Sequence, residues 1–148
     1  KAISYISEQK SIAPDKPFFL YFAPGAGHEP HQVEKYWSDK YKGKFDQGWD
    51  KYREVVIENQ KRLGVIPKDA QLPDRGPGVK AWESLSADEK RLYARFQEVY
   101  AGFLTHTDFE IGRIINHLKE LGQLENTIII VSVGDNGASK EGTFEGQV

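Results

Sequence analysis

Thr127-Ile-Ile-Ile-Val-Ser-Val133, followed at once by Gly134-Asp-Asn-Gly137, is the stretch that decides the fold class. β-Branched residues dominate the first part, which favours an extended strand, and the second part is a turn sequence. Because the run is apolar at consecutive positions, we expect both faces of the strand to be covered, as in the interior of an α/β sheet. The sequence therefore predicts a buried strand that ends just before Asp135.

A second run of the same character lies near the start of the chain. Pro17-Phe-Phe-Leu-Tyr-Phe-Ala23 predicts a strand that is also apolar on both faces, and Pro24-Gly-Ala-Gly27 breaks it. The segment His28-Glu-Pro-His31 then follows on a loop. We expect this loop to begin where the strand ends.

Helical patterns fill the space between the two predicted strands. Moderate signals span residues 33–41 and 47–63, within a helical and loop excursion over residues 33–85. Ser86-Ala-Asp-Glu89 is a capping box, and the apolar stripe that follows continues to Gly122. Since such a helix is unusually long, we allow a break near residues 102–107. A further short helix should precede Pro14, and Trp37, Trp49 and Trp82 are expected to pack beneath the excursion.

Strand, helical crossover and strand is the pattern of parallel pairing. We predict an α/β fold: part of a large, mostly parallel or mixed β-sheet flanked by helices, incomplete in this chain. Parallel strands place their carboxyl ends at one edge of the sheet, which is where ligands bind. His28 and the pair Asp135 and Asn136 should therefore share that edge.

Composition excludes several classes of function. Twenty basic residues are interspersed with 22 acidic ones, so the sequence offers no basic face for nucleic acid. No apolar run approaches the ~18 to 20 residues of a membrane span, and we expect no membrane partner. The chain has no cysteine, which excludes disulfides and thiolate metal sites. Lys1 opens directly into a helical pattern, so we expect an internal fragment of a longer chain. The sequence does not decide whether the parent protein is periplasmic or cytoplasmic.

The residue types at the predicted edge indicate metal and acid–base chemistry. Asp135 and Asn136 supply hard oxygen donors that suit Ca²⁺, or less well Mg²⁺, although the same dipeptide is also common in plain turns. His28 could bond an anionic substrate or exchange a proton near neutral pH, unless it is an ordinary surface histidine. A zinc-protease reading of His28 and His31 fails, because they lie three residues apart and Pro30 prevents the required helix.

Six motifs in order carry a resemblance to a known family. They are Pro17-Phe-Phe-Leu-Tyr-Phe-Ala-Pro24, His28-Glu-Pro-His31, Glu98-Val-Tyr-Ala101, Asp108-Phe-Glu-Ile-Gly-Arg113, Leu124-Glu-Asn-Thr127 and Gly134-Asp-Asn-Gly137. Together they resemble the middle of an arylsulfatase, a member of the sulfatase branch of the alkaline-phosphatase-like superfamily. The resemblance covers essentially the whole chain.

This resemblance implies hydrolysis of sulfate esters, with aryl sulfates as the expected substrates, by a formylglycine nucleophile beside a calcium ion. Asp135 and Asn136 match the family's late pair of calcium ligands, and His28 matches its catalytic, sulfate-contacting histidine. The nucleophile, made from a C/S-x-P-x-R motif, and the early aspartate ligands would precede Lys1, and a further substrate lysine would follow Val148. We therefore expect residues 1–148 to be an internal portion of a catalytic domain, inactive alone and prone to self-association.

Two alternatives stay open at this point. A phosphatase, phosphodiesterase or phosphonate hydrolase of the same superfamily could carry a similar turn with another nucleophile. A non-catalytic scaffold or binding module could keep the fold without the chemistry.

Overall fold

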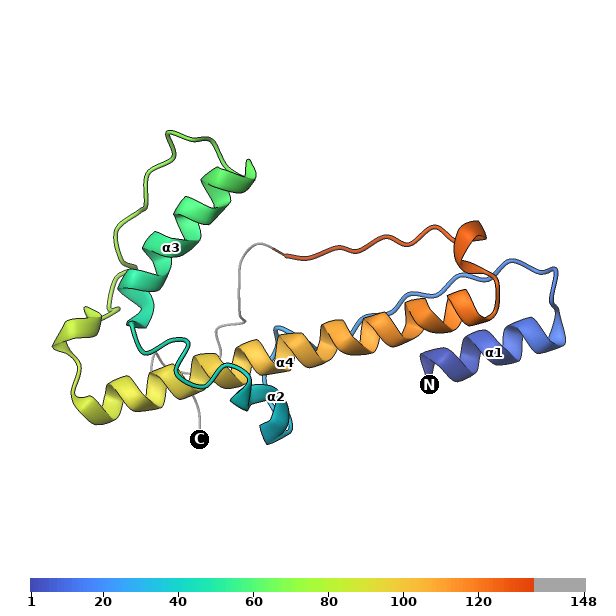
Figure 1. Ribbon diagram of the computed structural model, residues 1–148, viewed down its shortest axis with the longest axis horizontal. Helices are drawn as coiled ribbons and strands as arrows, with labels where there is room; N and C mark the ends of the chain where they lie inside the picture. The colour runs from blue at the N-terminus through green and yellow to red at the C-terminus, as the bar shows by residue number, and fades with distance from the viewer. Residues whose placement is uncertain (135–148) are drawn as a thin grey trace.

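The long helix α4 (Ala87–Glu120) is the axis around which the other elements are arranged (Figure 1). The computed structural model describes residues 1–134. Its other elements are α1 (Ala2–Ile12), α2 (Lys35–Asp39), α3 (Gly48–Leu63) and the 3₁₀ turns η1 (Trp82–Ser84) and η2 (Leu124–Asn126). Helix α1 lies along the carboxyl-terminal half of α4, α2 lies against its middle, and α3 projects away from it (Figure 1). No helix in residues 1–134 has the length and apolar content needed to cross a membrane.

Both ends of α4 follow from local chemistry, as the sequence predicts. The Ser86 hydroxyl accepts from the Glu89 amide at 3.2 Å, while the Glu89 carboxylate accepts from the Ser86 amide at 2.8 Å. Beyond the last turn, Gly122 takes the left-handed conformation with φ 64°. Its amide donates to the Lys119 carbonyl, which closes the helix. The break that we allowed near residues 102–107 is absent, so that expectation was wrong.

A glycine on α4 explains how α2 can lie so close. A Cβ added at Gly102 would lie 2.6 Å from the backbone nitrogen and Cα of Ser38, well inside van der Waals contact. Only glycine therefore allows this approach. Gly102 is a helix-contact residue rather than a point of weakness in α4.

An aromatic core lies where α3, η1 and the amino-terminal half of α4 meet. Phe45, Trp82, Leu85 and Ala94 are buried together, with Tyr41, Trp49, Tyr93 and Ala101 packed around them. The Trp49 and Trp82 rings meet edge to face with centroids 4.9 Å apart. This confirms that these two tryptophans pack beneath the excursion.

The predicted sheet is not confirmed in residues 1–134. Residues 17–24 and 127–134 are extended, but neither forms a ladder, and the structure assigns no strand in this part of the chain. The expectation that they are buried is also wrong here, since Phe19 is 83% exposed and Ile128 is 90% exposed. The physical reason is that a strand is defined by its neighbours, and a buried strand needs a partner on each side as well as covered faces.

Candidate functional site

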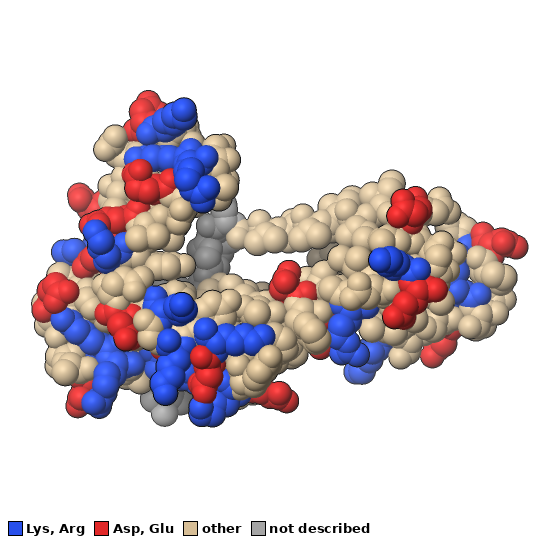
Figure 2. Space-filling model, viewed as in Figure 1, with Lys and Arg blue, Asp and Glu red and all other residues tan. Residues whose placement is uncertain are grey.

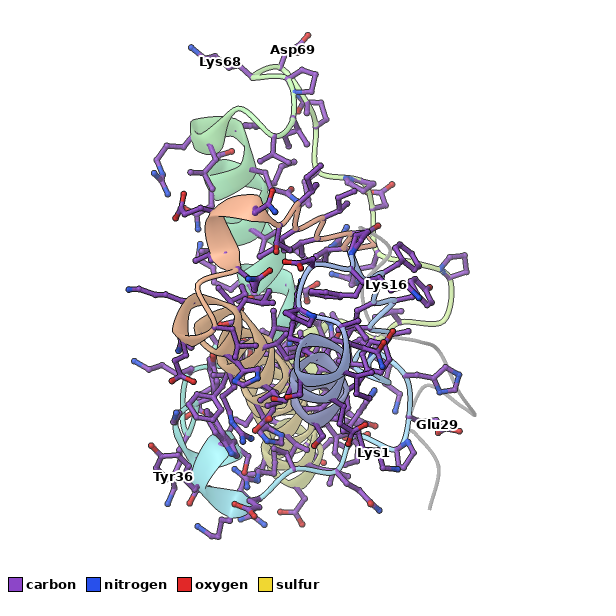
Figure 3. The ribbon with its side chains drawn as sticks, turned by 90° about the vertical axis from the view of Figure 1, so that its right-hand side faces the viewer. Lys1, Lys16, Glu29, Tyr36, Lys68 and Asp69 are labelled. Carbon is purple, nitrogen blue, oxygen red and sulfur yellow. The ribbon has the colours of Figure 1, made fainter. Side chains whose placement is uncertain are left out.

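His28 lies on a tight loop directly after the extended segment 17–24. Its backbone amide donates to the Gly25 carbonyl at 3.0 Å, and Gly27 has a φ of 93° that favours glycine. The imidazole is exposed, with Nδ1 2.9 Å from the Glu29 carbonyl oxygen. Because a carbonyl only accepts, Nδ1 carries the proton, and Nε2 is then the ring atom that gains or loses one. The loop projects outward: Figure 3 shows Glu29 at the edge of the molecule, on the opposite side of α4 from Tyr36.

His31 anchors the carboxyl-terminal side of this loop to α4. Its ring lies 5.1 Å from the Tyr100 ring and 5.9 Å from the Phe103 ring, measured between centroids. Its Nε2 is buried and has no hydrogen-bond partner among the described residues. The two histidines of the His28-Glu-Pro-His31 segment therefore have different environments, one exposed and one packed against the helix.

Helix α2 continues this anchor through a network of charged side chains on α4. Arg95 bonds the Ser38 hydroxyl at 2.8 Å and the Glu98 carboxylate at 2.7 Å, and it pairs with Asp39 at 3.2 Å. The second oxygen of Glu98, a residue only 5% exposed, accepts from the Gly43 amide at 2.8 Å. The network fixes the chain that follows the histidine loop to the middle of α4.

The pKa shifts in this network have clear causes. The hydrogen bond to Glu98, together with the charges of Glu98 and Asp39, raises the pKa of Arg95 above its ordinary value. The hydrogen bond from Lys35, with the nearby Arg95, lowers the pKa of Asp39. Both shifts favour the charged forms of Arg95 and Asp39.

Sequence reasoning missed this network, although the pattern contains a signal for it. Arg95, Glu98, Gly102 and Thr105 follow one another at spacings of three, four and three, beside the apolar stripe of α4. Thr105 completes the row, since its Oγ1 lies 2.5 Å from the Tyr41 hydroxyl. Polar and small residues at helical spacing indicate a second contact face.

The other two histidines, His106 and His117, have structural partners. His117 Nε2 lies 2.7 Å from the Ser7 hydroxyl and joins α1 to α4, next to the fully buried Ile6. The His106 ring lies 5.2 Å from that of Trp37. Neither lies on the loop that carries His28.

The predicted calcium ligands Asp135 and Asn136 lie outside the described residues, so their positions are not tested. Within residues 1–134, no group of three or more histidine, aspartate or glutamate side chains could hold a metal ion. The described part of the chain does not form a metal site by itself. Figure 2 also shows basic and acidic side chains mixed over the visible face, as expected from the sequence.

Comparison with known proteins places this loop in context. A family model described as Sulfatase matches residues 1–147. The chain is 39% identical over 134 residues to an uncharacterized sulfatase of Schizosaccharomyces pombe. The aligned region covers 90% of this chain and 24% of that protein. It is also 32% identical over 130 residues to an arylsulfatase of Klebsiella aerogenes, and that alignment covers 88% of this chain and 28% of that protein. An arylsulfatase of Clostridium perfringens is 30% identical over 124 residues, or 84% of this chain and 23% of that protein. The chain thus spans about a quarter of the length of these curated relatives.

Proposed function

The chain belongs to the sulfatase family, and from this premise we propose that it is an internal portion of a calcium-dependent arylsulfatase, a sulfuric ester hydrolase. The observation that carries the proposal is the family match over residues 1–147, with two relatives named arylsulfatase. The ordered motifs of the sequence support it, because they extend over the same range.

We assign His28 to the sulfate ester itself. Its exposed ring follows an extended segment, and the bond from Nδ1 to the Glu29 carbonyl sets the direction of Nε2. When Nε2 is protonated it donates a hydrogen bond to an oxygen on the leaving side of the ester, or transfers the proton to it. When it is neutral, Nε2 has no proton to donate to the ester.

We further assign Asp135 and Asn136 as two of the calcium ligands, because a carboxylate and an amide carbonyl are oxygen donors of the type that Ca²⁺ takes. Six to eight ligands are required, so the others would come from outside this chain. When bound, the ion would stabilise negative charge on the sulfate oxygens.

The nucleophile must also come from outside these 148 residues. The sequence has no cysteine and no Ser-x-Pro-x-Arg motif, so neither precursor of a formylglycine is present. The reaction that we propose therefore belongs to the longer parent protein.

The parent reading frame and its enzyme provide the test. We expect a C/S-x-P-x-R motif on the amino-terminal side, and turnover of a chromogenic aryl sulfate by the full-length protein. In that protein, His28→Asn should lower kcat by roughly 10² to 10⁴ without lowering the melting temperature. His106→Asn is the matched control and should keep near-wild-type kcat.

Two outcomes would overturn the proposal. Preferential turnover of phosphate monoesters or diesters, with a lone Ser or Thr in place of the motif, would assign the chain to another branch of the superfamily. A parent protein that lacks the early aspartates as well as the nucleophile would be a non-catalytic scaffold.

A further inference from the structure

His31 lies three residues after His28 on the same loop, and no step of the proposed hydrolysis uses it. Its ring centroid lies 5.1 Å from that of Tyr100, edge to face, and 5.9 Å from that of Phe103. Tyr100 and Phe103 are three residues apart on α4, so their side chains share one face of the helix. Together the three rings form what we call the histidine anchor.

The backbone of the loop forms local hydrogen bonds. Among the described residues, the His28 amide donates to the Gly25 carbonyl at 3.0 Å, and the Gln32 amide donates to the Pro30 carbonyl at 2.8 Å. Neither bond reaches another element of the fold, so the two bonds shape the loop but do not fix its place on the molecule. The histidine anchor supplies that restraint, because it joins the loop to α4.

The part of α4 that carries the anchor is itself held against the chain that follows the loop. Gly102, between the two aromatic residues of the anchor, lies so close to Ser38 that an added Cβ would be 2.6 Å from the Ser38 backbone. One turn further along α4, the His106 ring lies 5.2 Å from the Trp37 ring, measured between centroids. The chain is therefore fixed to α4 at His31 and again at residues 37–38.

The surroundings of the His31 ring indicate packing rather than contact with substrate. Its Nε2 is buried and has no hydrogen-bond partner among the described residues. An atom that is covered by protein reaches neither a substrate nor a metal ion unless the ring leaves its place. A buried nitrogen without a partner gives the ring no polar role there, so what the ring contributes is its aromatic surface. His28, by contrast, is exposed.

We propose that His31 is a positioning residue for the hydrolysis: through the histidine anchor it holds the loop so that His28 directs Nε2 at the leaving side of the sulfate ester. Three residues of chain span at most about 10 Å, so a loop that leaves the anchor carries His28 with it. A displacement of about 1 Å can cost roughly 100-fold in rate. The inference rests on the role that the proposed function gives to His28.

Two substitutions in the full-length parent separate packing from polarity. His31→Ala removes the ring, whereas His31→Phe keeps an aromatic ring and replaces its nitrogens by carbon. We expect His31→Ala to lower kcat by roughly 10- to 100-fold and to leave KM nearly unchanged, because His28 acts in the transition state. His31→Phe should restore kcat to near the wild-type value. Its melting temperature should be at least that of wild type, because the unpartnered nitrogen is gone.

The helix side of the anchor provides an independent variant. Tyr100→Leu keeps an apolar residue that favours helix but removes the ring that faces His31, and it should also lower kcat. The double variant His31→Ala/Tyr100→Leu should lose little more than the more impaired single variant, since both substitutions remove the same contact. His106→Ala is the matched control: it removes a histidine ring that packs against an aromatic side chain but lies off the loop. It should lower the melting temperature and keep kcat.

Hydrogen exchange measures the loop independently of activity. In peptides that cover residues 24–31, His31→Ala should speed the exchange of the His28 amide, which donates to the Gly25 carbonyl, and His31→Phe should not. If His31→Ala does not fold, His31→Phe and Tyr100→Leu decide the question by the same measurements.

Specific results overturn the inference. They are a His31→Phe variant as impaired as His31→Ala, wild-type kcat in His31→Ala or in Tyr100→Leu, and losses that add in the double variant. Sulfatase turnover by the wild-type parent would leave the proposed function intact in each case. Conversely, the expected losses of kcat on a phosphate ester, in a parent that turns over no sulfate ester, would uphold the positioning role and reject the proposed function. A parent that hydrolyses neither ester would overturn both.

Discussion

At the residue scale, Glu89 shows how a local sequence pattern fixes an electrostatic property. Its carboxylate accepts a hydrogen bond from the Ser86 amide and forms an ion pair with Lys80 at 3.2 Å. The bond from the Ser86 backbone, followed by the Ser86 hydroxyl and Lys80, lowers the pKa of Glu89 from 4.5 to about 2. The charged carboxylate therefore stabilises the start of α4.

The pH dependence follows from the sign of this shift. Since the folded-state pKa lies below the unfolded value, the contribution is fully present above about pH 4.5 and is lost as pH falls toward 2. We predict that Glu89→Gln lowers the thermal midpoint of helicity at pH 7, and that the difference from wild type disappears near pH 2. Circular dichroism at 222 nm measures it. Glu125→Gln, an exposed substitution in η2, is the control, and a difference that is constant across this range would contradict the prediction.

At the element scale, the helices could be predicted because their signals are local. The capping box, the apolar stripe and Gly122 together fix the ends of α4. The expected break at Gly102 was wrong for a tertiary reason: the glycine is required by the neighbouring backbone of Ser38, which lies far away in the sequence. A sequence pattern shows that a glycine is present, but not which backbone it lies against.

Two glycines of α4 give a matched test of this interpretation. Gly102→Ala should destabilise the fold, because its Cβ would meet the Ser38 backbone at 2.6 Å. Gly112→Ala has nothing within 4 Å of the added Cβ and should stabilise the helix by up to about 1 kcal/mol. Thermal unfolding of both variants decides the question. Equal stabilisation by the two alanines would show that α2 does not lie against Gly102.

At the scale of the whole molecule, the exposed apolar segments dominate the expected behaviour of the isolated chain. Unpaired extended segments with bare apolar faces favour association with further copies.

We therefore predict concentration-dependent oligomers for the isolated 148-residue chain at micromolar concentration. Introducing both Phe19→Lys and Ile130→Lys should shift the population toward monomer, because each places a charge on an exposed apolar face. Tyr36→Lys, an exposed aromatic position on α2, is the control and should leave the oligomers unchanged. Sedimentation velocity measures the populations, and a wild-type monomer at all concentrations would refute the prediction.

A further prediction concerns calcium and activity in the isolated chain. With only two proposed ligands, the affinity for Ca²⁺ should be weak. Micromolar Ca²⁺ should therefore leave the melting temperatures of both the wild-type chain and the Asp135→Asn variant essentially unchanged. The chain should also show no turnover of a chromogenic aryl sulfate, because it contains no nucleophile. A rise of several degrees in wild type that is lost in Asp135→Asn would reveal a complete local site, and turnover would contradict the assignment of the nucleophile.

By itself, the sequence determined the helices, their caps, the two extended apolar segments and the sulfatase motifs, because each depends on residues close together in the chain. The roles of His28, Asp135 and Asn136 stay proposals from that sequence. Only the tertiary structure revealed that His31 packs on α4 and that Gly102 allows α2 to lie close. It also revealed that the buried Glu98, together with the partly exposed Arg95, fixes the chain after the histidine loop. It also showed that, among residues 1–134, the two apolar segments form no strand pairing, since pairing and burial depend on neighbours that no local pattern supplies.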